Sequence, residues 1–213
     1  MKSLKQFIAI IVFAIISSSA FSQLSINPHL GYRLNFGEYS NNINLGFNGE
    51  YMLNNEKNVL YLGVDYYLPS STDGTIVAYS MQDGTQESLP AAYKTNFFSI
   101  SFGGKRYFAG DAEDDFAFYM RAGLGLNYGS TKAEPESYDQ NLFAVSEESL
   151  EKIKLSSMSI NLGLGYEKEF DFGYVFAEGN LNLNATSVND VEVAWSLPAA
   201  FIIQAGVRFP IYF

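Results

Sequence analysis

The chain has 213 residues, of which 16% are aromatic and 17% are charged, and its mean hydropathy is −0.01. This length allows one domain with a sizeable core, while the hydropathy is too polar for a bundle of membrane-spanning helices. The net charge of −10 disfavours nucleic acid as a partner. Cysteine is absent, which excludes disulfides, thiolate metal sites and a cysteine-linked lipid anchor.

Residues 1–22 are predicted to be a signal peptide that is cleaved from a mature domain spanning 23–213. Lys2 and Lys5 supply a positive start, residues 7–16 form an apolar run, and Ala20-Phe21-Ser22 fits a small-residue cleavage pattern. An uncleaved membrane helix is the alternative. It is disfavoured because the apolar run is shorter than the roughly 20 residues that a spanning helix needs.

Eight segments of the mature chain alternate apolar and polar residues with a period of two, which indicates β-strands. The expected strands are 24–36, 43–53, 58–68, 95–108, 116–128, 157–170, 174–186 and 198–213. The last of them is the most regular, because every odd position from Phe201 to Phe213 is apolar. Most are long enough for a tilted strand to cross a bilayer, which takes about 9–11 residues.

The links between these strands are expected to alternate between short turns and long loops. Residues 54–57, 109–115 and 171–173 would be short, as would 37–42, whereas 69–94, 129–156 and 187–197 would be long. In a closed barrel with an even number of strands, both termini and the short turns lie at one end. Residues 75–81 could instead extend a strand into an exposed hairpin, and 149–154 could form one helical turn.

The polar face of the strands carries four positive and four negative side chains, although the chain as a whole is strongly acidic. These eight residues are Arg33, Glu50, Asp65, Lys105, Arg121, Glu167, Glu178 and Arg208. The interior of an eight-stranded barrel has room only for its own side chains, and an unpaired buried charge is costly. The balance therefore predicts that the polar face lines a narrow lumen, where the eight charges form an ion-paired network. A soluble barrel with its apolar face inside is the alternative.

The architecture and the aromatic C-terminus resemble the eight-stranded bacterial outer-membrane β-barrels of the OmpA/OmpX type. They also resemble the outer membrane protein β-barrel group often labelled porin family or PorT-like. The resemblance implies an all-β, antiparallel, up-and-down transmembrane barrel in a Gram-negative envelope, with both termini periplasmic. It further implies periplasmic chaperones and the barrel-assembly machinery as partners, with Phe209, Ile211 and Phe213 as the assembly signal. Outer-membrane lipid and lipopolysaccharide would surround the barrel.

Few residues suggest chemistry, and we expect no catalytic residue, metal or cofactor. His29 is the single histidine and is expected to be a hydrogen-bonded lumen residue. The acidic turn at 111–115 could attract Ca²⁺, but a solvated turn is the preferred interpretation. The acidic loop at 130–156 could bind cations shared with lipopolysaccharide or an extracellular protein, and a simply solvated loop is equally compatible.

The leading functional prediction is a non-enzymatic outer-membrane protein with a structural, adhesive or envelope-integrity role, carried by its extracellular loops. The alternative is a narrow pore or uptake channel for small solutes, and a lipid-modifying enzyme is a third possibility. Outside the barrel, Arg106 and Lys168 are expected to extend toward lipid headgroups. Aromatic residues are expected at both membrane interfaces, and those of the outer interface would be Tyr32, Phe36, Tyr66, Tyr128 and Phe201.

Overall fold

The computed structural model describes residues 24–36, 40–53, 56–187 and 199–211, and nearly all of them lie in or beside β-strands. The predicted signal peptide, the start of the last predicted strand and Phe213 lie outside the described residues. Within the described ranges, no helix has both the length and the apolar character needed to cross a membrane.

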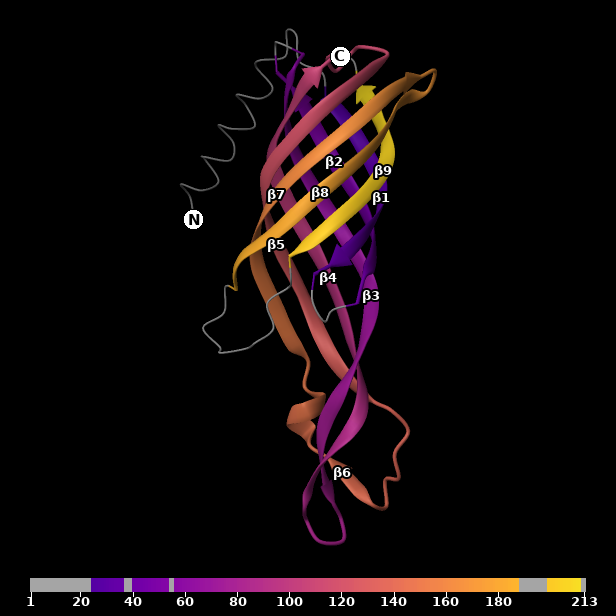
Figure 1. The fold of residues 1–213 in the computed structure, drawn as a ribbon, viewed down its shortest axis with the longest axis vertical. Helices are drawn as coiled ribbons and strands as arrows, with labels where there is room; N and C mark the ends of the chain where they lie inside the picture. Colours follow the sequence, from indigo (N-terminus) through magenta and orange to yellow (C-terminus); the bar gives the residue numbers. More distant parts are fainter. Residues whose placement is uncertain (1–23, 37–39, 54–55, 188–198, 212–213) are drawn as a thin grey trace, which may run out of the picture.

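Eight long strands form a closed antiparallel barrel, as the sequence predicted (Figure 1). They are β1 (Leu24–Asn35), β2 (Asn42–Met52), β3 (Asn58–Ser80), β4 (Gln86–Ala109), β5 (Phe116–Pro135), β7 (Ile153–Phe170), β8 (Gly173–Ser187) and β9 (Ala200–Ile211). Each strand pairs with its neighbours along the chain, and β9 returns to pair with β1. Two minor elements lie outside the barrel wall: β6 (Phe143–Val145) and the 3₁₀-helix η1 (Glu147–Leu150).

The first and last strands bring both ends of the barrel sequence to the same end of the molecule. Leu24 at the start of β1 pairs with Ile211 at the end of β9. The links β2–β3, β4–β5 and β7–β8 are short and lie at this end, which is uppermost in Figure 1. We call it the turn end, and the opposite end the loop end.

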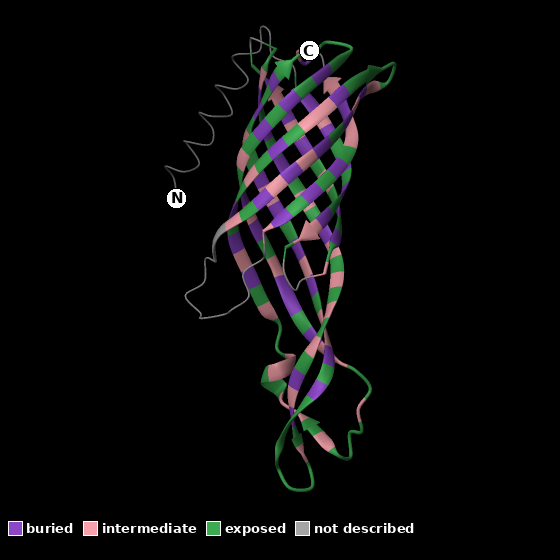
Figure 2. Cartoon of the chain, viewed as in Figure 1, coloured by how far each residue is buried: buried purple, intermediate pink, exposed green. Residues whose placement is uncertain are grey.

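The apolar face of the barrel points outward and the polar face points inward, as predicted, and the soluble-barrel alternative is wrong. Leu62 and Leu164 are 59% and 64% exposed, whereas Arg33, Glu167 and Arg208 are at most 1% exposed. The alternation is visible as bands of buried and exposed residues along each strand (Figure 2). An apolar exterior of this extent suits a surrounding lipid phase rather than water.

At the loop end the strands extend much farther than the sequence predicted. The link 69–94, expected to be a long loop, is mostly strand, because β3 and β4 continue as one hairpin to Ser80 and Gln86. The expectation that 75–81 could extend a strand is therefore confirmed, and that of a loop is wrong. β5 likewise continues to Pro135, and β7 already begins at Ile153.

The extended strands build a protrusion that stands clear of the barrel (Figure 1). We use the name protrusion for 70–95 and 129–153, which include β6 and η1. Its own apolar core contains Ile76, Ala78, Leu89, Ala91 and Ala133, with Tyr138, Phe143 and Leu150 packed against them. The helical turn predicted at 149–154 lies slightly earlier, at Glu147–Leu150, because Ile153 already belongs to β7.

Candidate functional site

The lumen is the most highly organised polar region of the barrel. At its turn end, the Glu167 carboxylate accepts hydrogen bonds from Arg208 at 2.7 Å, Tyr107 at 2.7 Å and Lys105 at 3.0 Å. Lys105 also lies 3.4 Å from Glu50, so two cations and two carboxylates form one ion-paired cluster. Arg208 further donates to the Ala112 carbonyl. The cluster joins β2, β4, β7 and β9 across the barrel.

A second ion pair lies nearer the middle of the lumen. Arg121 on β5 donates to Glu178 on β8 at 3.0 Å, and the same carboxylate oxygen accepts a hydrogen bond from Gln204 at 3.1 Å. The guanidinium also lies 3.8 Å from the centre of the Tyr61 ring, which is a cation–π distance. The Asn180 amide also donates a hydrogen bond to this carboxylate oxygen.

The two remaining predicted lumen charges lie apart from these groups. Asp65 lies 2.8 Å from the His29 ring and accepts a hydrogen bond from Asn44 at 2.9 Å. Arg33 donates to Asn35 at 2.7 Å and stacks near the Tyr67 and Phe97 rings, about 5 Å from their centres. The structure therefore divides the expected charge network into separate groups along the barrel axis.

Apolar side chains close the lumen at both ends. At the turn end, Tyr107 and Tyr119 pack with Ala112, which reaches in from the β4–β5 turn. At the loop end, the stacked rings of Tyr67 and Phe97, 4.1 Å between centres, pack with Leu155 and Ile202. Each of these residues is at most 6% exposed. These two groups enclose the polar middle of the barrel. We call the group at the turn end the inner closure and the group at the loop end the outer closure.

The acidic turn between β4 and β5 contributes to the inner closure. Its carboxylates bond to the turn's own backbone: Asp114 accepts from the Asp111 amide, and Asp111 accepts from the Glu113 amide. Ala112 is buried, and its backbone amide donates a hydrogen bond to the Glu56 backbone carbonyl. Among the described residues, no group of three His, Asp or Glu side chains is placed to hold a metal ion.

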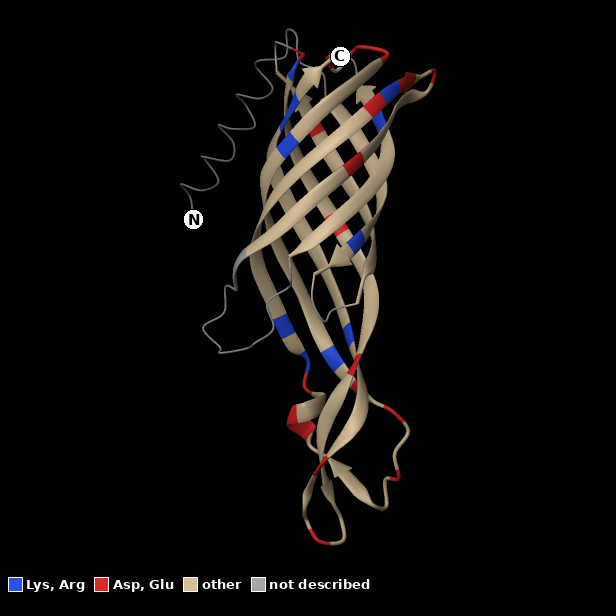
Figure 3. Cartoon of the chain, viewed as in Figure 1, with Lys and Arg blue, Asp and Glu red and all other residues tan. Residues whose placement is uncertain are grey.

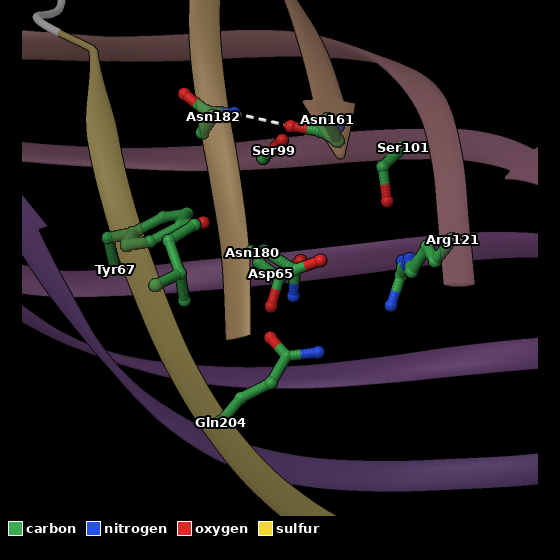
Figure 4. A pocket seen from close by; sticks show the side chains of 10 residues that line it. Asp65, Tyr67, Ser99, Ser101, Arg121, Asn161, Asn180, Asn182 and Gln204 are labelled. Carbon is green, nitrogen blue, oxygen red and sulfur yellow. Dashed lines mark hydrogen bonds between the residues drawn. The ribbon is translucent and has the colours of Figure 1, made fainter. Parts of the chain in front are cut away.

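A small polar cavity lies between the outer closure and Arg121 (Figure 4). Its volume is about 20 Å³, and Asp65, Ser99, Ser101, Asn180 and Gln204 contribute to its wall. A cavity of this size holds about one water, since a single water needs roughly 10–15 Å³. The side-chain oxygens of Ser101 and Asn180 have no hydrogen-bond partner among the described residues and would suit such a water.

The aromatic residues of the two closures were not singled out from the sequence. The signal was present, because these residues share the parity of the predicted lumen charges on their strands. Tyr67 comes two residues after Asp65, Tyr107 comes two after Lys105, and Phe97 precedes the lumen residue Ser99. Alternation therefore identifies a lumen residue even where the side chain is apolar.

The outer surface holds the residues expected at the membrane interfaces. Phe209 is 41% exposed on the lipid-facing side of β9, and Ile211 is half-buried at the strand's end, while Phe213 lies outside the described residues. Arg106 and Lys168 are exposed near the turn end. The outer aromatic residues are exposed near the loop end, at Tyr32, Phe36, Tyr66, Tyr128 and Phe201.

Comparison with protein-family models and with curated proteins found no match to this sequence. Among solved structures, the chain is similar to Neisserial surface protein A, with a TM-score of 0.54, 12% sequence identity, and coverage of 90% of this chain and 97% of that one. It is also similar to a major outer membrane protein from Thermus thermophilus, with a TM-score of 0.54, 11% identity, and coverage of 89% and 99%. At such low identity these similarities show the fold alone. The chain therefore has the fold of the eight-stranded outer-membrane β-barrels that its sequence resembles.

Proposed function

We propose that this protein is a non-enzymatic barrel of the bacterial outer membrane, in which the barrel is an anchor and the protrusion is an interaction surface. The turn end and both termini would be periplasmic, and the protrusion would be extracellular. Its role would be structural, adhesive or concerned with envelope integrity. The observation that carries this proposal is the closure of the lumen at both ends, which leaves the protrusion as the part able to meet a partner.

The shape and surface of the protrusion support this role. It has its own apolar core, so the hairpin presents a defined surface rather than an unstructured loop. At its far end, Tyr79, Met81 and Leu142 are 45%, 62% and 39% exposed, and the Met81 amide donates to the Leu142 carbonyl. Exposed apolar side chains gathered in this way are typical of protein-binding surfaces.

A narrow pore is the second candidate, because the middle of the lumen is polar. Conductance across planar lipid bilayers decides between the two. We expect wild-type protein to show no stable ion current, since the outer closure and the cluster around Glu167 block the path at two levels. A steady current through wild-type protein would overturn the anchor proposal and favour the pore.

Two sets of substitutions test by conductance whether each closure blocks the lumen. Tyr67→Ala together with Phe97→Ala removes the outer closure and leaves the inner one, so the current should remain absent. Adding Tyr107→Ala and Tyr119→Ala thins the inner closure as well, and a small leak should then appear. A current from the first pair alone would mean that the inner closure does not block ions.

A lipid-modifying enzyme is the least supported candidate. Histidine commonly serves as the general base in hydrolysis and acyl transfer. The single histidine, His29, is 6% exposed and is engaged with Asp65 inside the barrel. It therefore lies away from the surface where a lipid substrate would be.

The residues Phe209, Ile211 and Phe213 remain the proposed assembly signal, read by the periplasmic assembly machinery. Deleting Phe213 should leave the protein in the periplasm or in aggregates, whereas Phe213→Tyr, which keeps an aromatic end, should assemble normally. The measurement is the amount of heat-modifiable barrel in isolated outer membranes. Normal assembly after the deletion would remove Phe213 from the signal.

A further inference from the structure

The charges of the protrusion are segregated along its length (Figure 3). The protrusion and Lys154, which directly follows it on β7, contain four lysines and nine acidic residues. All four lysines lie at the base, where the barrel passes into the protrusion: Lys94, Lys132, Lys152 and Lys154. Most of the acids lie farther out, on the hairpin, around β6 and on η1. If the lysines served only solubility, they would be interspersed with the acids.

Three of these lysines occupy one face of neighbouring strands. Lys94 on β4 is directly paired with Lys132 on β5, and Lys154 on β7 is paired with Ser130, which precedes Lys132 on the same side of β5. All three lysines are exposed. Lys94 lies on the same side of β4 as the lipid-facing Phe98 and Phe102, so this face continues the lipid-facing surface of the barrel. We call these three residues the lysine belt.

The belt lies a short distance from the aromatic residues of the outer membrane interface, on the side toward the protrusion. Phe98 and Tyr128 are paired, 5.5 Å between ring centres, and each is four residues from a belt lysine. That separation is about 13 Å along the strands, at roughly 3.3 Å per residue. Between them lies a row of small polar residues containing Asn96 and Ser130. Lysine side chains are long enough to extend from this height toward the headgroups.

The acids nearest the belt neutralise only part of its charge. Glu134 forms an ion pair with Lys94 at 2.5 Å, and both side chains are about half exposed. Asp73 and Glu134 are both paired with Ala92, so the two acids lie at the same level of the sheet. This level is one outward position farther from the barrel than the pair Lys94 and Lys132. Among the described residues, the outward neighbours of Lys132 and Lys154 on the side that faces the barrel are aromatic or small and polar, and none of them is acidic.

We propose that the lysine belt binds the phosphate groups of an anionic glycolipid headgroup in the outer leaflet, such as those of lipopolysaccharide. This inference rests on the proposed orientation of the barrel in the outer membrane. Ammonium groups on a surface next to an anionic leaflet attract its headgroups, and lysine binds phosphate as a point charge. The belt residues lie on β4, β5 and β7, so the lipid would occupy this one side of the barrel, next to the base of the protrusion.

The test compares two triple variants of the full chain in detergent solution. Lys94→Gln, Lys132→Gln and Lys154→Gln remove the belt. The control is Lys57→Gln, Arg106→Gln and Lys168→Gln, which removes three exposed positive charges at the turn end. Binding of bisphosphorylated lipid A is titrated for each variant, alongside dephosphorylated lipid A and inorganic phosphate. Heat-modifiable migration confirms that each variant is folded.

Wild type and control should bind bisphosphorylated lipid A equally, and the belt variant should bind it about tenfold or more weakly, as expected for the loss of several charges facing an anionic surface. Dephosphorylated lipid A should bind weakly to all three proteins, and inorganic phosphate should not saturate the site. The preference should fall as salt is raised.

Three results would overturn the proposal. The first is equal affinity of the belt variant and the wild type, and the second is an equal loss in the control. The third is binding that EDTA abolishes while the belt substitutions leave it unchanged, which would assign the lipid to the acidic residues through bridging cations. None of these results bears on the closed lumen. A protein that fails to enter lipid vesicles would instead overturn the proposed function.

Discussion

The barrel and the protrusion are built from the same strands, yet their faces have opposite polarity. Along β4, the outward residues of the barrel include Phe102 and Phe98 and the inward ones include Lys105 and Ser101. Beyond Asn96 the outward side carries Lys94, and the inward side carries Ala91 and Leu89. The core of the barrel is polar and that of the protrusion is apolar, which agrees with the proposed placement of the barrel in lipid and of the protrusion in water.

The inversion indicates that one strand can place its apolar residues outward in one part and inward in another, as expected for a strand that passes from lipid into water. In β3 it coincides with a register shift between Tyr67 and Ser70, around Pro69, which cannot donate a backbone hydrogen bond. The extra residue of this bulge exchanges the outward and inward positions, as a shift of one residue does in any strand. Ile76 and Ala78 can therefore face the core of the protrusion.

Breaking the polar core of the barrel should have the largest effect. Glu167→Gln leaves Lys105 and Arg208 without the full charge of their shared partner, and loss of one member of a buried ion group costs about 3–5 kcal/mol. We expect a large fall in the free energy of unfolding, measured by denaturant titration of the barrel in lipid. The exposed acid Glu169, two residues farther along the same strand, offers a control in Glu169→Gln, which should leave the stability unchanged. Equal stability of Glu167→Gln and wild type would show that the cluster contributes nothing.

A charge placed on the outward face of β4 tests whether that face meets lipid in the barrel and water in the protrusion. Phe102→Arg should destabilise the barrel by about 2–4 kcal/mol, the cost of an arginine facing lipid near the membrane midplane. Ala92→Arg lies on the same side of β4 but in the protrusion, where it meets water and the acids Asp73 and Glu134. It should change the stability little. Similar losses from both variants would contradict the boundary near Asn96.

Breaking the apolar core of the protrusion should have a local effect. Ile76→Asn places an amide among apolar side chains and should unfold the hairpin, because a buried polar group without a partner costs about 1–3 kcal/mol. Limited proteolysis should then cut the protrusion rapidly while the barrel keeps its denaturation midpoint. Thr75→Asn, at an exposed neighbouring position, is the control and should remain resistant. A barrel that loses stability with Ile76→Asn would mean that the two parts unfold as one.

The smallest effect is expected at the ion pair of the protrusion. The hydrogen bond and charge of Lys94 lower the pKa of Glu134 below its usual value. Any stabilisation from this pair is therefore present above the ordinary pKa of a glutamate and is lost as the pH falls through the lowered pKa. Because the carboxylate is exposed, Glu134→Gln should leave the protease resistance of the protrusion nearly unchanged at neutral pH. A clear loss of resistance would show that this surface pair matters for the fold.

The sequence by itself determined the barrel, its strand number and the direction of its faces. Period-two alternation over lengths that span a bilayer leaves few other architectures, and four cations balanced by four acids indicated an enclosed polar face. The same pattern predicted that one strand ends near Leu68 and that the next begins near Thr95, whereas both continue into the protrusion. The polarity of the strands inverts there, so a pattern defined by an apolar outside no longer continues.

Only the tertiary structure decided which charges meet and how the lumen is closed. Glu167 meets Lys105 and Arg208 because strand order and register bring β4, β7 and β9 to the same level across the barrel. Tyr67 and Phe97 stack because β3 and β4 pair at that residue. Alternation states which way a side chain points, but contacts across a closed barrel depend on the stagger of every strand between the partners.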